Sequence, residues 1–324
     1  MKRRQFIAIA AALAPSFPWA QPRDTDPLWG PLRLVFPFPA GGAGDALARA
    51  LAADLADALG RPVVVENRTG AAGRLGVQAV RAAGADGGAL LLTPSAPMVV
   101  YPHLYENLGY DPMRDFAPVA RVAAFEMAVV VDPALPVRTP QELAAWLAAN
   151  PQRTNYGTPG TGTLAHLVMA ALASHWALPL VHVPYRGTPP ALMDVAGGRL
   201  SMACSAIGEM MPAHREGRVR IVATSGTVRS GFSPDTLTLR EAGVPFSAVN
   251  WYGVYAPASS SQDFLRRVSA ALLAFVGSDD FRRKALSLGF QPAPADGAAL
   301  GAAQREESEF WARVIRGADI RVAS

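Results

Sequence analysis

The segment that decides the fold reads Leu32-Arg33-Leu34-Val35-Phe36, then Pro37-Phe38-Pro39-Ala40-Gly41-Gly42-Ala43-Gly44-Asp45. Its first five residues are mainly large and apolar and predict a buried strand, and the Pro/Gly stretch predicts a loop. Asp45 stands where it can cap a following helix. Leucines then recur at helical spacing, at Leu47, Leu51, Leu55 and Leu59, until Gly60 and Pro62 end the pattern. The segment therefore predicts a strand–loop–helix unit.

The same unit repeats along the chain. A second strand at 63–65, a helix at 75–83 and a third strand at 89–93 complete a βαβαβ pattern. A second series with the same rhythm begins at 125–131 and continues to 219–224. Such alternation is typical of a mainly parallel sheet flanked by helices, with ligands gathering at the carboxyl ends of the strands.

The chain length predicts two lobes. Its 324 residues exceed the ~100–200 residues of a typical domain. With crossings near 119–125 and 249–255, we expect residues 21–122 and 253–324 to form the first lobe and residues 123–252 the second, with a ligand cleft between them. The expected fold class is therefore α/β and two-lobed, each lobe a mainly parallel sheet flanked by helices.

The first twenty residues resemble an export signal. Lys2, Arg3 and Arg4 precede an apolar stretch, and Trp19-Ala20 precedes Gln21, near which the mature protein is expected to start. The paired arginines fit a twin-arginine signal or an ordinary one, and both routes stay open. The apolar stretch falls short of the ~20 residues that span a bilayer, so cleavage is favoured over anchoring.

Charge and cysteine content exclude several classes of function. The signal carries three Lys/Arg and no acid, so its removal lowers the formal charge from +4 to +1, which gives little attraction to nucleic acid. Cys204 is the only cysteine, so an internal disulfide and a four-cysteine zinc site are excluded. It lies in an apolar run, which predicts a buried structural thiol. No cysteine stands near Gln21 to carry a lipid anchor.

Two glycine loops have the form of anion sites. In the loop 39–45, glycines permit close backbone approach and amides at a helix start point outward. The residues concerned are Pro39, Ala40, Gly41, Gly42, Ala43, Gly44 and Asp45, the last expected to rigidify the loop as a cap. An ordinary turn between strand and helix is the alternative, and neither the phosphate-loop nor the dinucleotide pattern is matched. No cofactor is predicted.

The second loop is also glycine-rich and precedes a helix, and it adds hydroxyl groups. It contains Thr158, Gly160, Thr161, Gly162 and Thr163, and His166 follows one helical turn later. For His166 we favour a packing or capping role over ligand contact.

A turn after a later strand contains Tyr185, Arg186 and Gly187. There the guanidinium could pair with a carboxylate, or it could be an ordinary surface arginine.

Signs of catalysis are few. Ser95, Ser205 and Ser225 lack a nucleophile-elbow setting, and the five histidines include no pair at metal-binding helical spacing. We therefore predict a binding protein with no metal and no catalytic residues.

Read in order, the motifs resemble the Bug-type receptors of tripartite tricarboxylate transporters. The resemblance is carried by 37–42 with Asp45 and Ala48-Arg49, Val64 to Arg68, 70–73, Tyr110-Asp111-Pro112 with 115–119, Tyr156-Gly157, Gly160, His166-Leu167, 183–187, Gly197-Gly198 and Trp251-Tyr252-Gly253. It covers nearly the whole mature chain.

The resemblance implies a type II-like, two-lobed periplasmic binding protein that closes on an organic acid and delivers it to a membrane permease. We expect the protein to be a monomer. It implies that the two glycine loops hold a ligand carboxylate through amides, hydroxyls and waters, with Ser95 and Tyr185 to Gly187 as cleft neighbours. A sensor receptor and a small-molecule enzyme on a similar scaffold remain the alternatives.

Two departures from the family pattern bear on the ligand. Gly44 stands where many relatives have Ser or Thr, and Ser205 stands where relatives often carry Asp. Losing an acid at Ser205 makes the cleft less suited to an amino group, so a plain mono- or dicarboxylate is the expected ligand.

Overall fold

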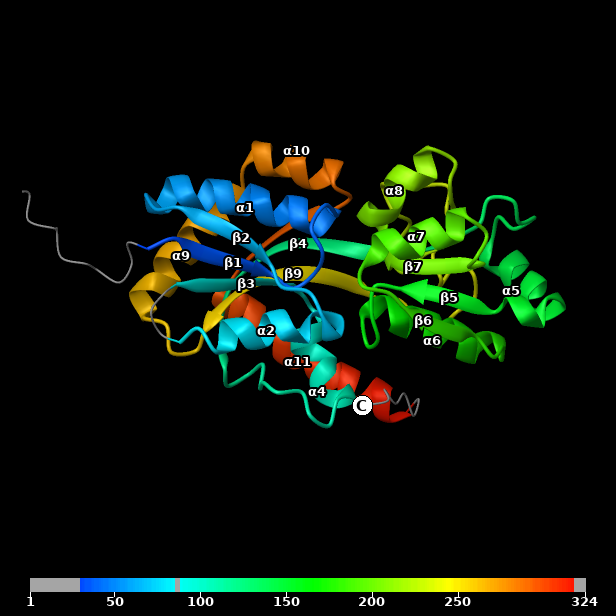
Figure 1. Cartoon of the computed structure of the whole chain (residues 1–324), viewed down its shortest axis with the longest axis horizontal. Helices are drawn as coiled ribbons and strands as arrows, with labels where there is room; N and C mark the ends of the chain where they lie inside the picture. Colours follow the sequence, from blue (N-terminus) through cyan, green and yellow to red (C-terminus); the bar gives the residue numbers. More distant parts are fainter. Residues whose placement is uncertain (1–29, 85–87, 318–324) are drawn as a thin grey trace, which may run out of the picture.

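The computed structural model describes residues 30–84 and 88–317. The predicted signal, 1–20, lies outside the described residues. Within the described part, no helix is both long and apolar enough to cross a bilayer. Two lobes lie side by side and share one long strand, β4 (Figure 1).

The main sheet path runs β2-β1-β3-β9-β4-β7-β5-β6, and β8 and β10 each pair with β4. The strands are β1 (Leu32–Phe36), β2 (Val63–Asn67), β3 (Ala89–Pro94), β4 (Phe116–Val131), β5 (Asn155–Thr158), β6 (Val181–Pro184), β7 (Met202–Ala206), β8 (Arg220–Thr224), β9 (Val249–Pro257) and β10 (Gln291–Asp296). The helices are α1 (Ala43–Leu59), η2 (Ala71–Gly73), α2 (Arg74–Arg81), α3 (Ala96–Val99), α4 (Tyr101–Leu104), α5 (Pro140–Ala149), η3 (Pro151–Arg153), α6 (Leu164–Trp176), α7 (Thr188–Ala196), α8 (Ile207–Arg215), α9 (Gln262–Val276), α10 (Asp279–Ser287) and α11 (Gly297–Gly317).

The predicted strand–loop–helix unit is confirmed as β1, its loop and α1. β1 runs parallel to β2 and β3, with Leu34 opposite Val65 and Leu90. The periodic leucines of α1 face the core, since Leu47, Leu51 and Leu55 are buried. The helix ends at Gly60, whose φ of 63° lies in the left-handed region that glycine adopts without strain.

The sheet is mixed, because its central strands are antiparallel. The predicted strand 125–131 is the end of a longer strand, β4, that begins at Phe116 and is antiparallel to β9 in the first lobe and to β7 and β8 in the second. The predicted parallel pairs lie outside this centre, in β1-β2, β1-β3, β5-β6 and β5-β7. Alternation of strands and helices does not fix the direction of strands that carry the chain between lobes.

The second lobe is built around β7, which lies between β4 and β5. Cys204 is fully buried on β7, and this burial raises the pKa of its thiol. The prediction of a buried structural thiol is confirmed.

The helices after β9 pack against the first lobe. α9 contacts α1 and β4, and α11 contacts β4 and the short helices α3 and α4 (Figure 1). The boundary residues proposed for the lobes, 122/123 and 252/253, stay predictions.

Candidate ligand-binding cleft

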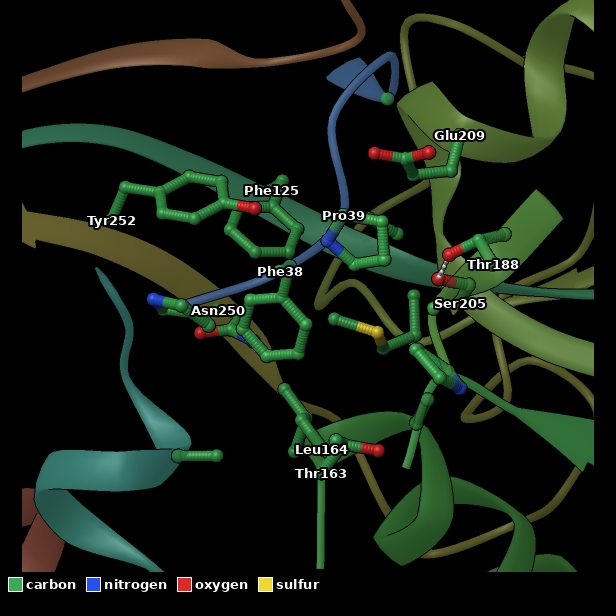
Figure 2. Close-up of a pocket in the computed structure, with 18 of the residues that line it drawn as sticks. Phe38, Pro39, Phe125, Thr163, Leu164, Thr188, Ser205, Glu209, Asn250 and Tyr252 are labelled. Carbon is green, nitrogen blue, oxygen red and sulfur yellow. Dashed lines mark hydrogen bonds between the residues drawn. The ribbon is translucent and has the colours of Figure 1, made fainter. Parts of the chain in front are cut away.

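A pocket lies between the two lobes, where strand ends meet helix starts (Figure 2). Its walls are largely apolar and include the rings of Phe36, Phe38, Tyr101, Phe125 and Tyr252. Polar side chains are few: Thr163, Thr188, Ser205, Glu209 and Asn250. No Lys or Arg is among the described residues that line it. A ligand here would meet neutral donors and aromatic surface rather than a fixed positive charge.

Five of the residues predicted for the site line this pocket: Pro39, Gly42, Thr163, Gly187 and Ser205. The other predicted residues lie outside the lining: Ala40, Gly41, Ala43, Gly44, Asp45, Ser95, Thr158, Gly160, Thr161, Gly162, Tyr185 and Arg186. Both glycine loops therefore contribute to the pocket, each through part of its length. As ligand contacts, all of these residues stay predictions.

The carboxylate of Asp45 holds the first loop together. It accepts hydrogen bonds from the Gly41 amide at 3.0 Å, from Arg49 Nε at 2.9 Å and from Asn67 Nδ2 at 2.8 Å. Burial alone would raise the pKa of Asp45, but these hydrogen bonds hold the pKa below its ordinary value. The predicted cap position was wrong: Gly42 is the N-cap, and Asp45 lies in the first turn, from which its side chain reaches back to the loop.

The amides at the start of α1 already have an acidic partner. The Gly44 amide donates to Glu209 Oε1 across the cleft at 3.3 Å. A Cβ at Gly42 would lie 2.6 Å from the same oxygen, so glycine allows this approach. Burial raises the pKa of Glu209. Sequence reasoning missed Glu209; its place in the first turn of a helix directly after a strand was the available signal.

In the second loop, Thr163 caps α6. Its Oγ1 accepts from the His166 amide at 3.4 Å and donates to the Gly160 carbonyl at 2.8 Å. The next two amides, of Leu164 and Ala165, find no acceptor among the described residues, and both residues line the pocket. The start of α6 therefore offers donors to the cleft.

The side chain of His166 forms a hydrogen bond to this loop. Its Nδ1 accepts from the Gly162 amide at 3.1 Å, and its ring stacks on His182 with centroids 4.0 Å apart. His182 in turn stacks on Tyr156 and contacts Thr158 Oγ1 at 2.7 Å. Burial lowers the pKa of His166 to about 4 and that of His182 to about 3. These contacts match the predicted packing role of His166.

The turn after β6 points its polar groups away from the lining. The Tyr185 hydroxyl donates to Asp194, which also pairs with Arg199, and Arg186 is exposed. Gly187 reaches the cleft: a Cβ there would lie 2.8 Å from Pro39 Cγ in the other lobe. Nearby, Thr188 Oγ1 and Ser205 Oγ lie 2.7 Å apart (Figure 2).

The family model described as "Tripartite tricarboxylate transporter family receptor" matches residues 47–320. The chain belongs to this receptor family. The Bug resemblance is confirmed: a relative from Pseudomonas sp. (strain P51), "UPF0065 protein in tcbD-tcbE intergenic region", is 32% identical over 97% of the chain and 94% of its own length. "Protein BugT" of Bordetella pertussis is 31% identical over 96% of the chain and 94% of its own length.

Solved structures share the receptor fold. The periplasmic binding protein BugD superposes with a TM-score of 0.85 at 29% identity, covering 90% of the receptor and 98% of that chain. A protein of R. palustris, described "with adipate", gives 0.85 at 28% identity over 90% and 97%. MatC of Rhodopseudomonas palustris, described "with bound malate", gives 0.81 at 28% over 88% and 98%. The two-lobed periplasmic-binding-protein fold is thus confirmed.

The receptor offers little for metal chemistry in its described part. Within residues 30–84 and 88–317, no group of three or more His, Cys, Asp or Glu is arranged to hold a metal ion. The family is one of solute-binding receptors.

Proposed function

We propose that the receptor captures a small organic carboxylate in the cleft and delivers it to a tripartite tricarboxylate-type permease. The observation that carries this proposal is the start of α6, where the amides of Leu164 and Ala165 have no acceptor among the described residues and both residues line the pocket. Amides at a helix start are fixed donors in a favourable field, which suits an anion without a positive side chain. Adipate and malate in the related structures support the same ligand class.

The pocket walls favour an acid with an apolar body. Phe36, Phe125 and Tyr252 form a connected group of rings, with Phe125 and Tyr252 stacked at 4.8 Å. Burying methylenes or a ring against these faces adds binding free energy in proportion to area. The carboxylate of Glu209 already occupies the α1 amides, so a second ligand carboxylate there would meet a like charge. We therefore infer a monocarboxylate, or a long dicarboxylate whose second carboxylate lies away from Glu209.

We also propose that residues 1–20 are a cleaved export signal and that the receptor works in the periplasm as a monomer without a lipid anchor. The periplasmic relatives support the location, and the missing cysteine near Gln21 supports the free form. The permease partner follows from the transporter named in the family description.

The ligand class is tested by thermal unfolding of receptor purified from the periplasm and refolded to remove bound solute. We expect melting temperature to rise with concentration for carboxylates, since a ligand at 100 times its Kd stabilises by about 2.7 kcal/mol. Each acid is paired with its primary amide and its amine as matched controls. Stabilisation by amines alone, or by none of the acids, would contradict the proposal.

Replacing Glu209 with glutamine is expected to raise the affinity for the stabilising acid about tenfold, or about 1.4 kcal/mol. Glutamine keeps an acceptor for the Gly44 amide but removes a like charge from the cleft. Titration calorimetry at fixed pH and salt measures the Kd, and Glu216→Gln, at an exposed position just after α8, is the control. A large loss of affinity would show instead that Glu209 accepts a hydrogen bond from the ligand.

A further inference from the structure

Asn250 places a buried amide in the cleft wall. It lies near the start of β9, opposite Phe125 of β4, where these two strands reach the second lobe. Asn250 is only 3% exposed, yet it is one of the residues that line the pocket (Figure 2).

Two backbone donors fix the orientation of this amide. Asn250 Oδ1 accepts from the Ser95 amide at 3.0 Å and from its neighbour Trp251 at 2.9 Å. Rotating the amide by half a turn would place its NH₂ against these two N–H groups and leave both unpaired in a buried site. The oxygen therefore faces the backbone, and Nδ2 faces the other way.

The nitrogen of the same amide has no partner among the described residues. No acceptor lies within hydrogen-bonding geometry of Nδ2 there, and Nδ2 is not among the fully buried unpaired polar atoms of the described residues, so it keeps some exposure at the pocket. An oriented donor that opens into a cleft is suited to a ligand acceptor. The role expected for Ser95 also becomes indirect, because its amide holds Asn250 in place and Ser95 itself lies outside the lining.

We propose that Asn250 binds a ligand oxygen through Nδ2 and selects, at that point of the cleft, a hydrogen-bond acceptor over an amine. The inference rests on the proposed function, a receptor for carboxylates, and assigns it a recognition residue. The neutral NH₂ group of Asn250 suits a carboxylate or carbonyl oxygen of the ligand, which accepts a hydrogen bond. Against a ligand ammonium group, donor would face donor and no hydrogen bond would form. The ligand oxygen that accepts from Nδ2 belongs either to the carboxylate of the ligand or to another polar group of the ligand.

The decisive variant is Asn250→Asp. Aspartate keeps an oxygen for the Ser95 and Trp251 amides and exchanges the donor for a charged acceptor, so the change is confined to the side that faces the ligand. We expect the affinity for the acid found in the thermal panel to fall by about 10- to 100-fold, the usual cost of losing a hydrogen bond to a charged group. The amine counterpart of that acid should bind more tightly than it binds the unaltered receptor.

The control is Asn107→Asp, which makes the same chemical change at an exposed position outside the cleft. It should bind as the unaltered receptor does. Equal acid binding by Asn250→Asp and the unaltered receptor would overturn the role of Asn250 and leave the proposed function intact. An unaltered receptor that binds no acid would overturn both.

A measurement on the unaltered receptor covers the case in which Asn250→Asp does not fold. Asparagine labelled in its side-chain amide gives an NMR signal for each NH₂ group, and the ligand should shift one buried pair strongly downfield while the signals of exposed asparagines stay in place. No shift in any buried asparagine amide at saturating acid would overturn the proposal.

Discussion

Gly208→Val is expected to weaken ligand binding by holding the lobes apart. Gly208 lies in α8 of the second lobe, and a Cβ there would lie 1.9 Å from the carbonyl oxygen of Leu288, which follows α10 in the first lobe. The clashing oxygen belongs to the backbone, so no side-chain rotation can relieve the clash. Overpacking of this kind costs about 1–3 kcal/mol. If this cost destabilises the closed form relative to the open form, the apparent affinity for the ligand falls by roughly 5- to 150-fold.

Small-angle scattering and calorimetry check this result together. The variant should show a larger radius of gyration than the unaltered receptor at saturating ligand, as well as a weaker Kd. Gly231→Val is the matched control, because no atom lies within 4 Å of a Cβ at that exposed position of the same lobe. Unchanged affinity and radius in Gly208→Val would show that the Gly208 contact with Leu288 does not limit closure.

The stacked pair His166 and His182 is expected to make the receptor lose stability in acid. Burial lowers their pKa values to about 4 and about 3 in the folded chain, below the ordinary histidine value of about 6.5. As pH falls below about 6.5, the unfolded chain takes up protons that the folded chain does not, so stability drops until the folded pKa is reached. For His166 alone the loss is on the order of 3 kcal/mol.

Urea unfolding between pH 7.5 and pH 4 measures this dependence, roughly the window set by the histidine pKa values. In the double variant His166→Asn, His182→Gln, the side-chain amides can replace the contacts to Gly162 and Thr158 without titrating, so the loss in acid should shrink. His175→Asn, at an exposed position of the same helix, should behave as the unaltered receptor. An equal loss in the double variant would locate the acid sensitivity in other groups.

The local units and several site positions could be predicted because they depend on neighbours in the sequence. The leucine spacing of α1, the Gly60 stop and the loop before α6 each follow from contacts within one unit. The prediction that Asp45 is the N-cap was wrong. The helix α1 begins after Gly42 without a side-chain cap, and the Asp45 carboxylate accepts a hydrogen bond from the Gly41 amide of the loop instead.

Contacts between residues far apart in the sequence could not be predicted in this way. Glu209 meets the Gly44 amide across 165 positions of sequence, and Asn250 meets Ser95 across 155. Glu209 has only the weak signal of a first helical turn directly after a strand, and Asn250 has none, since a single Asn is ordinary on a strand. The role of Glu209 arises when the second lobe packs beside α1, and that of Asn250 when β9 pairs with β3.

The sequence by itself determined the α/β units and the two glycine loops, because hydrophobic periodicity and turn residues act over a few neighbouring positions. The family followed from the resemblance of its motifs, taken in order along the chain. Only the tertiary structure decided which donors face the cleft. Within the described residues, those donors are free or occupied according to what packs against them: Glu209 accepts from the start of α1, the first amides of α6 have no acceptor, and two backbone N–H groups orient the Asn250 amide.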